Sequence, residues 1–251
     1  MVDLNPGSEK QSEEQKSVIP ETEPENTHAE NYRINSFHLG EGSPKQKFRA
    51  NMDAIYTLKT LENQHRDATP EEQETLANYV GWGGLADAFD AEKAAWTGEY
   101  KELKAALTEE EYAAARASTL NAHYTSPTVI RAIYEALDGM GFEKGNILEP
   151  SMGVGNFFGM LPDSMLGSRL YGVELDSITG RIAQKLYPQA EIKVAGFETT
   201  DHRDFYDLAV GNVPFGNYRV SDKPYDKLGF SIHNYFFAKA LDQVRPGGIV
   251  A

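Results

Sequence analysis

The chain has 251 residues, of which 40% are hydrophobic and 25% are charged, so it has enough apolar sequence for one large domain or two small ones. Its formal net charge of -14 argues against tight electrostatic binding of nucleic acid by the chain as a whole, because neutralising phosphates needs basic patches. There is no cysteine, which excludes disulfides, thiolate zinc sites and a cysteine nucleophile, and the six histidines show no HExxH-type spacing, so we expect no metal centre.

The N-terminal residues 1–30 are polar and acidic, with eight acidic and two basic side chains. Ordering such a segment costs conformational entropy that its few apolar residues do not offset, so the composition predicts a disordered tail. No apolar stretch approaches the roughly 20 residues that cross a bilayer, and the first residues lack the apolar run of a secretory signal. We therefore expect a cytoplasmic protein that does not contact a membrane.

Helical patterns dominate residues 31–120, which we expect to form a small all-helical domain. Apolar residues recur at helical spacing in KFRANMDAIYTLKTLEN, and this predicts an amphipathic helix over residues 45–63. Two capping boxes, in which a Thr is followed three residues later by a Glu, predict helices that begin after Thr69 and after Thr108. The second of these helices is expected to run to about Ser118.

From about residue 121, short apolar strands alternate with helices. Strands are predicted at residues 146–149, 169–174, 191–194 and 205–210 and from residue 248 onward, and helices at residues 127–137, 176–187 and 232–244. This alternation is typical of parallel strands joined by crossover helices, so we expect residues 121–251 to form an α/β domain with a Rossmann-like fold. The sequence ends inside the last predicted strand, and we therefore expect this domain to be truncated at its C-terminus.

A glycine-rich loop follows the first predicted strand, in the sequence ILEPSMGVGNFFG. Its residues of interest are, in order, Glu149, Ser151, Gly153 and Gly155. The glycines allow the backbone to approach a ligand closely, and the amides at the following helix start can meet polar groups of that ligand. A simple turn between a strand and a helix is the alternative.

Glu174 ends the second predicted strand, about twenty residues after the glycines, where an acid can accept hydrogen bonds from ribose hydroxyls. Such an acid suits any cofactor that contains adenosine, including dinucleotides and S-adenosylmethionine (SAM). Alternatively, Glu174 and Asp176 only cap the next helix.

Two features of the loop favour SAM over a dinucleotide. Phe158 occupies the place where dinucleotide loops have their third glycine, which lets the helix pack close so that the pyrophosphate sits on its N-terminus. The acidic Glu149 would repel a pyrophosphate, whereas it suits the cationic amino group of a methionine moiety.

A second candidate loop, GNVPFGNY, follows the fourth predicted strand. The side-chain oxygen of Asn212 and the carbonyl of Val213 can accept hydrogen bonds from an adenine amino group and so turn its lone pair toward a methyl donor. Pro214 makes this arrangement rigid, and Phe215 can stack on the base. Because the carboxyl ends of parallel strands meet at one edge of a sheet, we expect this loop to converge with the glycine loop and Glu174.

The residues Asn212, Val213, Pro214 and Phe215 resemble the catalytic tetrapeptide of the SAM-dependent methyltransferases that act on amino groups, in which the second position is usually proline. The chain from residue 31 onward resembles, more closely, the N12 class of adenine-specific DNA methyltransferase modules. These modules occur in very long methyltransferase-helicase polypeptides of mobile elements. The stretches that carry the resemblance are KFRANMDAI, YVGWGGL, STLNAHYTSP, ILEPSMGVGNFFGMLP, YGVELDSITGRIA, GNVPFG and IHNYFFAKALDQVRPGGI.

This resemblance implies methyl transfer from SAM to the N6 amino group of adenine in DNA, on a base that is flipped out or single-stranded. It also implies that Tyr124, Thr125 and Pro127 contact the methionine end of SAM. Phe197 is then expected to cover the adenine ring of the cofactor, and Glu198 to accept from its amino group. Helicase and DNA-recognition regions are expected elsewhere in the full-length polypeptide.

Three alternatives stay open from the sequence. The tetrapeptide recognises an amino group and not a polymer, so the substrate can instead be an RNA adenine or a protein glutamine. A truncated domain can also be an inactive module that binds SAM or serves for docking. A dinucleotide-dependent oxidoreductase is the third alternative, and it predicts binding of NAD.

Overall fold

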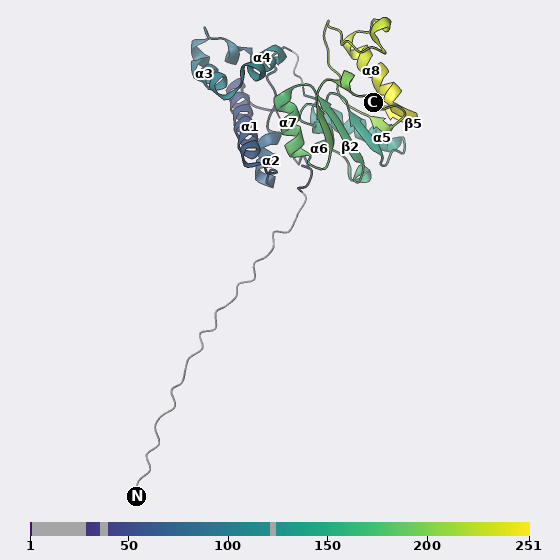
Figure 1. The fold of residues 1–251 in the computed structure, drawn as a ribbon, viewed down its shortest axis with the longest axis horizontal. Helices are drawn as coiled ribbons and strands as arrows, with labels where there is room; N and C mark the ends of the chain where they lie inside the picture. Colours follow the sequence, from purple (N-terminus) through teal and green to yellow (C-terminus); the bar gives the residue numbers. More distant parts are fainter. Residues whose placement is uncertain (2–28, 36–39, 121–123) are drawn as a thin grey trace.

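The computed structural model describes residue 1 and residues 29–35, 40–120 and 124–251. Most of the predicted disordered tail therefore lies outside the described residues, and so does the predicted domain boundary at residue 121. We call residues 40–120 the helical part and residues 124–251 the α/β part, and Figure 1 shows the two side by side. Of the helices in the described ranges, none is long and apolar enough to cross a membrane.

The helical part begins with a long helix, and shorter helices follow it. Its helices are α1 (Pro44–Gln64), α2 (Pro70–Ala77), η1 (Ala86–Phe89), η2 (Ala94–Trp96), α3 (Thr97–Ala106) and α4 (Glu109–Ser118). Both predicted capping boxes are confirmed: Thr69 accepts from the backbone N–H three residues later, Thr108 does the same, and each Glu accepts in return. The sequence patterns do not predict α3, because its N-cap residue, Trp96, offers no capping side chain.

The α/β part contains one sheet of five parallel strands in the order β3-β2-β1-β4-β5. The strands are β1 (Asn146–Glu149), β2 (Arg169–Glu174), β3 (Glu191–Val194), β4 (Tyr206–Ala209) and β5 (Val244–Val250). The helices are α5 (Pro127–Gly139), α6 (Asn156–Gly159), η3 (Asp163–Met165), α7 (Ser177–Leu186), η4 (Phe197–Thr199), η5 (Asp226–Leu228) and α8 (Ile232–Gln243). The predicted Rossmann-like α/β fold is confirmed, with β1, β2 and β3 at their predicted bounds.

Strand β5 differs from its prediction, because it begins at Val244 and not at residue 248. Tyr206 of β4 pairs with Val244, and Leu208 pairs with Ile249, so the residues between form a bulge within the strand. The Pro-Gly-Gly sequence of residues 246–248 suits such a bulge, because proline has no N–H for the ladder and Gly247 has a φ of 81°.

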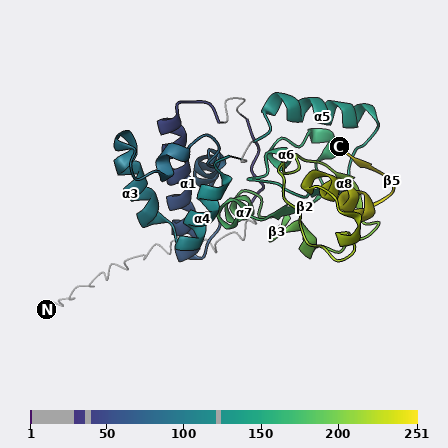
Figure 2. The ribbon, with the colours of Figure 1, turned by 90° about the horizontal axis from the view of Figure 1, so that it is seen from above.

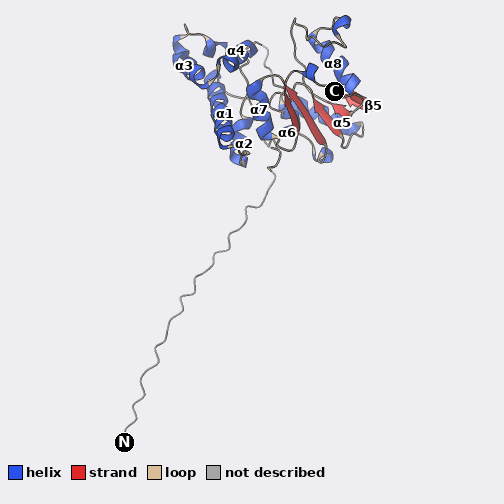
Figure 3. Cartoon of the chain, viewed as in Figure 1, coloured by secondary structure: helices blue, strands red, loops and turns tan. Residues whose placement is uncertain are grey.

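Alternate residues of the strands pack on opposite faces of the sheet. Ile147 of β1 contributes to the hydrophobic core under α5, α6 and α7, whereas Leu148 contributes to the core under α8. Figure 3 shows the strands between α6 and α7 on one side and α8 on the other. Helix α7 also contacts α1 and α2, and Figure 2 shows it between the helical part and the sheet.

Residues 31–35, predicted to belong to the helical domain, lie instead along the α/β part. The backbone N–H of Tyr32 donates to the Leu186 carbonyl, and that of Ile34 donates to the Gly159 carbonyl, both at 2.8 Å. Asn31 adds a side-chain contact, because its Oδ1 accepts from the N–H of Gln189 at 2.9 Å. This segment therefore packs beside the helix that follows the glycine loop.

Candidate cofactor and catalytic site

One large cleft, about 1030 Å³ in volume, lies at the carboxyl ends of the strands. The segments that follow β1, β2, β3 and β4 all contribute to its lining, as expected for a ligand site of an open α/β sheet. Small-molecule sites are usually about 300–1,000 Å³, so this cleft is large enough for a cofactor together with part of a substrate. We call it the strand-end cleft.

Most of the predicted site residues line the strand-end cleft together. They are Tyr124, Thr125, Glu149, Ser151, Gly153, Glu174, Phe197, Glu198, Asn212, Val213, Pro214 and Phe215. Two of the predicted residues are not in the lining. Pro127 is a buried residue in the first turn of α5, and Gly155 is the buried N-cap of α6.

The two glycines of the loop have different tasks in the structure. Gly153 has a φ of 57°, and a Cβ at this position would lie 2.9 Å from Cε1 of Tyr124, so the lack of a side chain lets the Tyr124 ring close over the loop. Gly155 has a φ of 83°, and a Cβ there would lie 2.5 Å from Cε2 of Tyr187. Gly155 is therefore required for packing of the loop against the core.

Glu149, at the end of β1, is a buried acid with an unused oxygen. Its side chain lines the cleft although the residue is only 2% exposed, and its Oε2 has no hydrogen-bond partner among the described residues. Burial, and then the nearby Glu174 carboxyl, raise the pKa of Glu149 well above its ordinary value. A buried acceptor without a partner suits a ligand that brings a donor or a positive charge.

Glu174 connects the glycine loop to the end of β2. Its carboxyl accepts from the backbone N–H of Gly153 at 2.8 Å and from that of Asp176 at 2.8 Å. Burial raises the pKa of Glu174 to about 7, although these two hydrogen bonds act in the opposite direction. Asp176 caps α7, as the alternative interpretation of the sequence predicted, because its Oδ1 accepts from Thr179 N–H at the start of that helix. Glu174, in contrast, lines the cleft.

The segment after β3 brings an aromatic ring and an acid to the cleft. Phe197 is 2% exposed, and its ring centroid lies 5.0 Å from that of Phe236 on α8, so it belongs to the core as well as to the lining. Glu198, in contrast, is exposed and lines the cleft. The pair thus offers an apolar surface and an acceptor beside each other.

The loop after β4 presents an amide and an aromatic ring at the mouth of the cleft. Asn212 is exposed, and no hydrogen bond joins its side chain to any other described residue. Phe215 is 63% exposed and lines the cleft, so its ring is accessible to a ligand there. The arrangement can accept hydrogen bonds from a planar group and stack on its ring.

Sequence reasoning missed part of the lining. Tyr79 and Gly81 of the helical part reach the cleft, and so do Tyr218 and Ile232. Tyr218 belongs to the same GNVPFGNY stretch as the tetrapeptide, and this proximity in the sequence could have predicted that it lines the cleft. No signal in the sequence connects Tyr79 with the sheet, because that contact depends on how the two parts of the chain pack.

The lining of the cleft is strongly acidic. It includes Glu110, Glu111, Glu149, Glu174, Asp176 and Glu198, and Arg181 is the one Lys or Arg among the described lining residues. Within the described ranges, no group of three or more His, Asp or Glu side chains is arranged to hold a metal ion. With Arg181 as the one Lys or Arg among the described lining residues, the cleft offers few positive charges to neutralise a polyphosphate.

The strand order, the glycine loop after β1 and the acid at the end of β2 define a Rossmann-like α/β protein. No family model matches the chain. The chain is 29% identical over 217 residues to the defense against restriction protein B of Escherichia phage P1, an alignment that covers 84% of the chain and 8% of that protein. It is also 34% identical over 92 residues to the type II methyltransferase M.CvrRI of Paramecium bursaria Chlorella virus XZ-6E, covering 37% of the chain and 24% of that protein.

Among solved structures, a putative class I S-adenosylmethionine-dependent methyltransferase from Listeria monocytogenes aligns with 82% of the chain and 72% of its own length. The sequence identity is 14% and the TM-score is 0.42. The chain spans less than a quarter of the length of the two sequence relatives. Part of the chain is therefore similar in sequence to a type II methyltransferase.

Proposed function

We propose that this chain binds SAM in the strand-end cleft and transfers the methyl group to the N6 amino group of adenine in DNA, as an N12-class module of a longer polypeptide. The observation that carries the proposal is the shared cleft of four separate strand-end segments, with the unpartnered Glu149 carboxyl oxygen inside and the free Asn212 amide at the mouth. The names of the two sequence relatives, a type II methyltransferase and a defense against restriction protein, support methyl transfer and DNA as the substrate.

The residues of the cleft fit SAM. The unpartnered oxygen of Glu149 suits the ammonium of the methionine moiety, and Tyr124 and Thr125 line the cleft near Gly153. Glu174 would hold the ribose hydroxyls, and Phe197 with Glu198 would hold the adenine. When bound, SAM supplies an electrophilic methyl group on a sulfonium.

The tetrapeptide would activate the amino group of the target. The Asn212 Oδ1 and the Val213 carbonyl would accept hydrogen bonds from its two N–H groups, which turns the nitrogen lone pair out of the ring system and toward the methyl donor. Pro214 restricts the backbone, so the two acceptors keep their positions. Phe215 would stack on the target base, which must leave the helix to reach the cleft.

A substitution of Asn212 tests this assignment. We expect Asn212→Ala to leave the SAM dissociation constant nearly unchanged in calorimetry and to lower methyl transfer by about 100-fold or more, because a preorganised polar contact to the reacting group is lost. Asn217→Ala is the matched control, because Asn217 lies in the same loop but does not line the cleft. Transfer by Asn212→Ala at the wild-type rate would exclude the role proposed for Asn212.

The substrate class needs separate assays with DNA, RNA and protein. Transfer to DNA adenine supports the proposal, whereas transfer only to RNA adenine or to protein glutamine supports the alternative substrates. The acidic lining and the net charge of -14 favour a further candidate, in which this chain binds SAM and other regions of the polypeptide bind DNA. SAM binding without transfer by this chain, and transfer by the longer polypeptide, would support that candidate.

A further inference from the structure

The helical part forms one wall of the strand-end cleft. Its contribution comes from the segment after α2, with Tyr79 and Gly81, and from α4, with Glu110, Glu111 and Ala114. Asn51 of α1 holds the first of these segments, because its Nδ2 donates to the Gly81 carbonyl at 2.6 Å and its Oδ1 accepts from Val80 N–H at 2.8 Å. A ligand in the cleft therefore lies between the sheet and the helical part.

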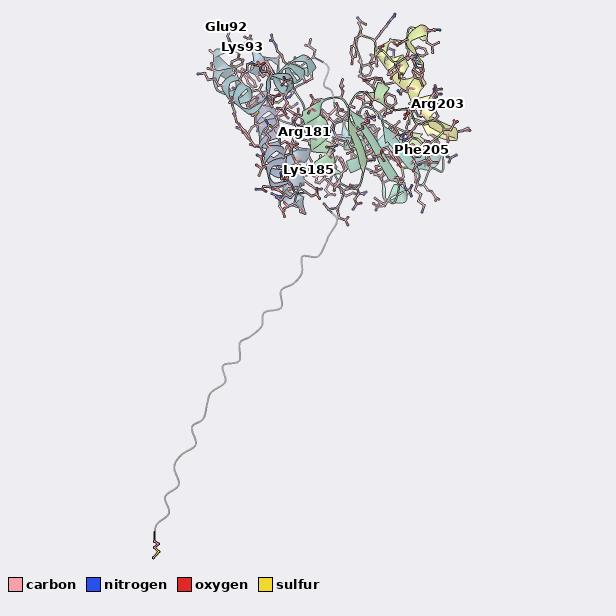
Figure 4. All side chains as sticks on the ribbon, viewed as in Figure 1. Glu92, Lys93, Arg181, Lys185, Arg203 and Phe205 are labelled. Carbon is pink, nitrogen blue, oxygen red and sulfur yellow. The ribbon has the colours of Figure 1, made fainter. Side chains whose placement is uncertain are left out.

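Arg181 of α7 connects this wall to the α/β part. Its Nη1 donates to both carboxyl oxygens of Glu62 on α1, at 3.0 and 2.9 Å, and its Nη2 donates to Glu111 on α4. Arg181 and Glu111 both line the cleft, so this connection is at its edge. Figure 4 shows Arg181 and Lys185 on the side of α7 that faces the helical part.

Glu111 is itself fixed by several contacts. Its side chain is only 11% exposed, and its carboxyl accepts from Thr108 N–H at 3.0 Å in the capping box of α4 and lies 3.5 Å from Lys59 Nζ on α1. Arg181 therefore donates to a carboxylate that is also bound to the N-terminus of α4. The planar guanidinium is needed for this geometry, since its two Nη groups serve two carboxylates at once.

We propose that Arg181 is a positioning residue of the cofactor site, which joins Glu62 to Glu111 and so holds the helical wall closed over bound SAM. This inference rests on the proposed function, because it concerns SAM in the same cleft. The helical part then contributes to the affinity of the cleft for SAM. Loss of the Arg181 contacts lets α4 move away from the cleft and weakens SAM binding.

The test compares variants at one interface. Arg181→Met removes both ion pairs but keeps an apolar stem of similar length. Lys185→Met is the matched control: Lys185 lies one turn further along α7, bonds the Arg66 carbonyl at 2.6 Å in the same interface, and does not line the cleft. Glu62→Ala is the third variant, because Glu62 lies outside the lining and can act on SAM only through Arg181.

We expect Arg181→Met to raise the SAM dissociation constant about 2- to 30-fold, the range for residues that couple a site to its surroundings. Glu62→Ala should also raise the SAM dissociation constant, but by a smaller factor. Arg181→Lys should bind SAM more tightly than Arg181→Met. Lys185→Met should change the dissociation constant less than twofold. In a transfer assay, Arg181→Met should raise KM for SAM more than it lowers kcat. In hydrogen exchange, SAM should protect the α4 amides of the wild type more than those of Arg181→Met.

Two results would overturn the inference while leaving the proposed function intact. The first is wild-type SAM affinity in Arg181→Met together with a melting temperature that falls as in Lys185→Met, because Arg181 would then be only an interface contact. The second is equal loss of SAM affinity in Arg181→Met and Lys185→Met, because the whole interface would then set the affinity. A wild-type chain that binds no SAM would instead overturn the proposed function and this inference together.

Discussion

Lys239 and Asp222 form an ion pair of 2.7 Å in the interior of the α/β part, with side chains that are 4% and 9% exposed. The same Asp222 oxygen also accepts from the hydroxyl of Tyr235, at 2.7 Å. Both partners of Asp222 belong to α8, whereas Asp222 belongs to the segment that continues from the candidate catalytic loop. The pair therefore ties this segment to the helix that covers the sheet behind it.

Removal of the lysine should be costly. We expect Lys239→Met to lower the free energy of unfolding by about 3–5 kcal/mol, because it leaves a buried carboxylate without its charge partner. Arg203→Ala is the control, since Arg203 pairs with Asp242 at 3.4 Å through side chains that are 62% and 45% exposed. That change should cost about 0–1 kcal/mol. Urea denaturation measures the free energy of unfolding of each variant. An equal loss in Lys239→Met and Arg203→Ala would contradict this prediction.

Two glycines with similar φ angles should differ in their response to alanine. In Gly155→Ala the new Cβ would lie 2.5 Å from the Tyr187 ring, whereas at Gly167, with a φ of 86°, it would meet no heavy atom within 4 Å. We expect Gly167→Ala to cost about 1–2 kcal/mol for the positive φ alone. Gly155→Ala should lower the free energy of unfolding by roughly a further 1–3 kcal/mol, because the new methyl group overpacks the core. Thermal denaturation checks this, and a Gly155 variant as stable as the Gly167 variant would show that the loop can relax.

Local signals in the sequence predicted most of the secondary structure. The capping boxes at Thr69 and Thr108 start helices where expected, because a cap depends on residues only three positions apart. Likewise, the first three strands agree with their predicted bounds, because each is a short stretch with apolar residues between turns or helices. Helix α3 was missed because Trp96 at its start carries no cap.

Most of the candidate site was predictable because its residues end or follow strands, whereas Tyr124 and Thr125, which line the cleft from the segment before α5, were predicted from the family resemblance. Glu149, Glu174 and Asn212 come together because parallel strands bring their carboxyl ends to one edge, which alternation of strands and helices already implies. The contribution of Tyr79 depends on packing between segments far apart in the chain, and no local pattern encodes it. Gly155 was predicted to contact the cofactor from its position in the motif, but it does not line the cleft. It packs against Tyr187 instead.

Phe215 should matter for the substrate and not for stability. Stacking of a base on an aromatic side chain contributes about 1–3 kcal/mol, so Phe215→Ala should weaken binding of single-stranded DNA that contains adenine by about 5- to 150-fold. Phe215→Tyr should keep most of the affinity. The matched control is Phe237→Ala, because Phe237 is 46% exposed on α8 and does not line the cleft. Fluorescence anisotropy measures the affinities, and equal effects of the two alanine variants would argue against stacking on Phe215.

SAM affinity should rise with pH through neutrality because of Glu174. Burial raises the pKa of Glu174 to about 7, compared with 4.5 in an unfolded chain, so the ligand-free folded protein holds a proton there between these values. This contribution to stability is present below pH 4.5 and is lost as the pH rises through about 7. Ribose hydroxyls donate to the ionised carboxylate, so binding must release that proton below pH 7.

We therefore expect the SAM dissociation constant to fall by up to about tenfold per pH unit from pH 6 to pH 7 and to level off above that, as linkage of one proton requires. Calorimetry in two buffers with different ionisation enthalpies should detect the released proton at pH 6 and less of it at pH 8. Glu174→Gln should bind SAM more weakly and lose the dependence centred near pH 7, and any dependence that remains should come from Glu149, whose pKa is also raised by burial. An affinity that is constant between pH 6 and pH 8 in the wild type would contradict this assignment of Glu174, because a carboxyl that is already ionised at pH 6 has no proton to release.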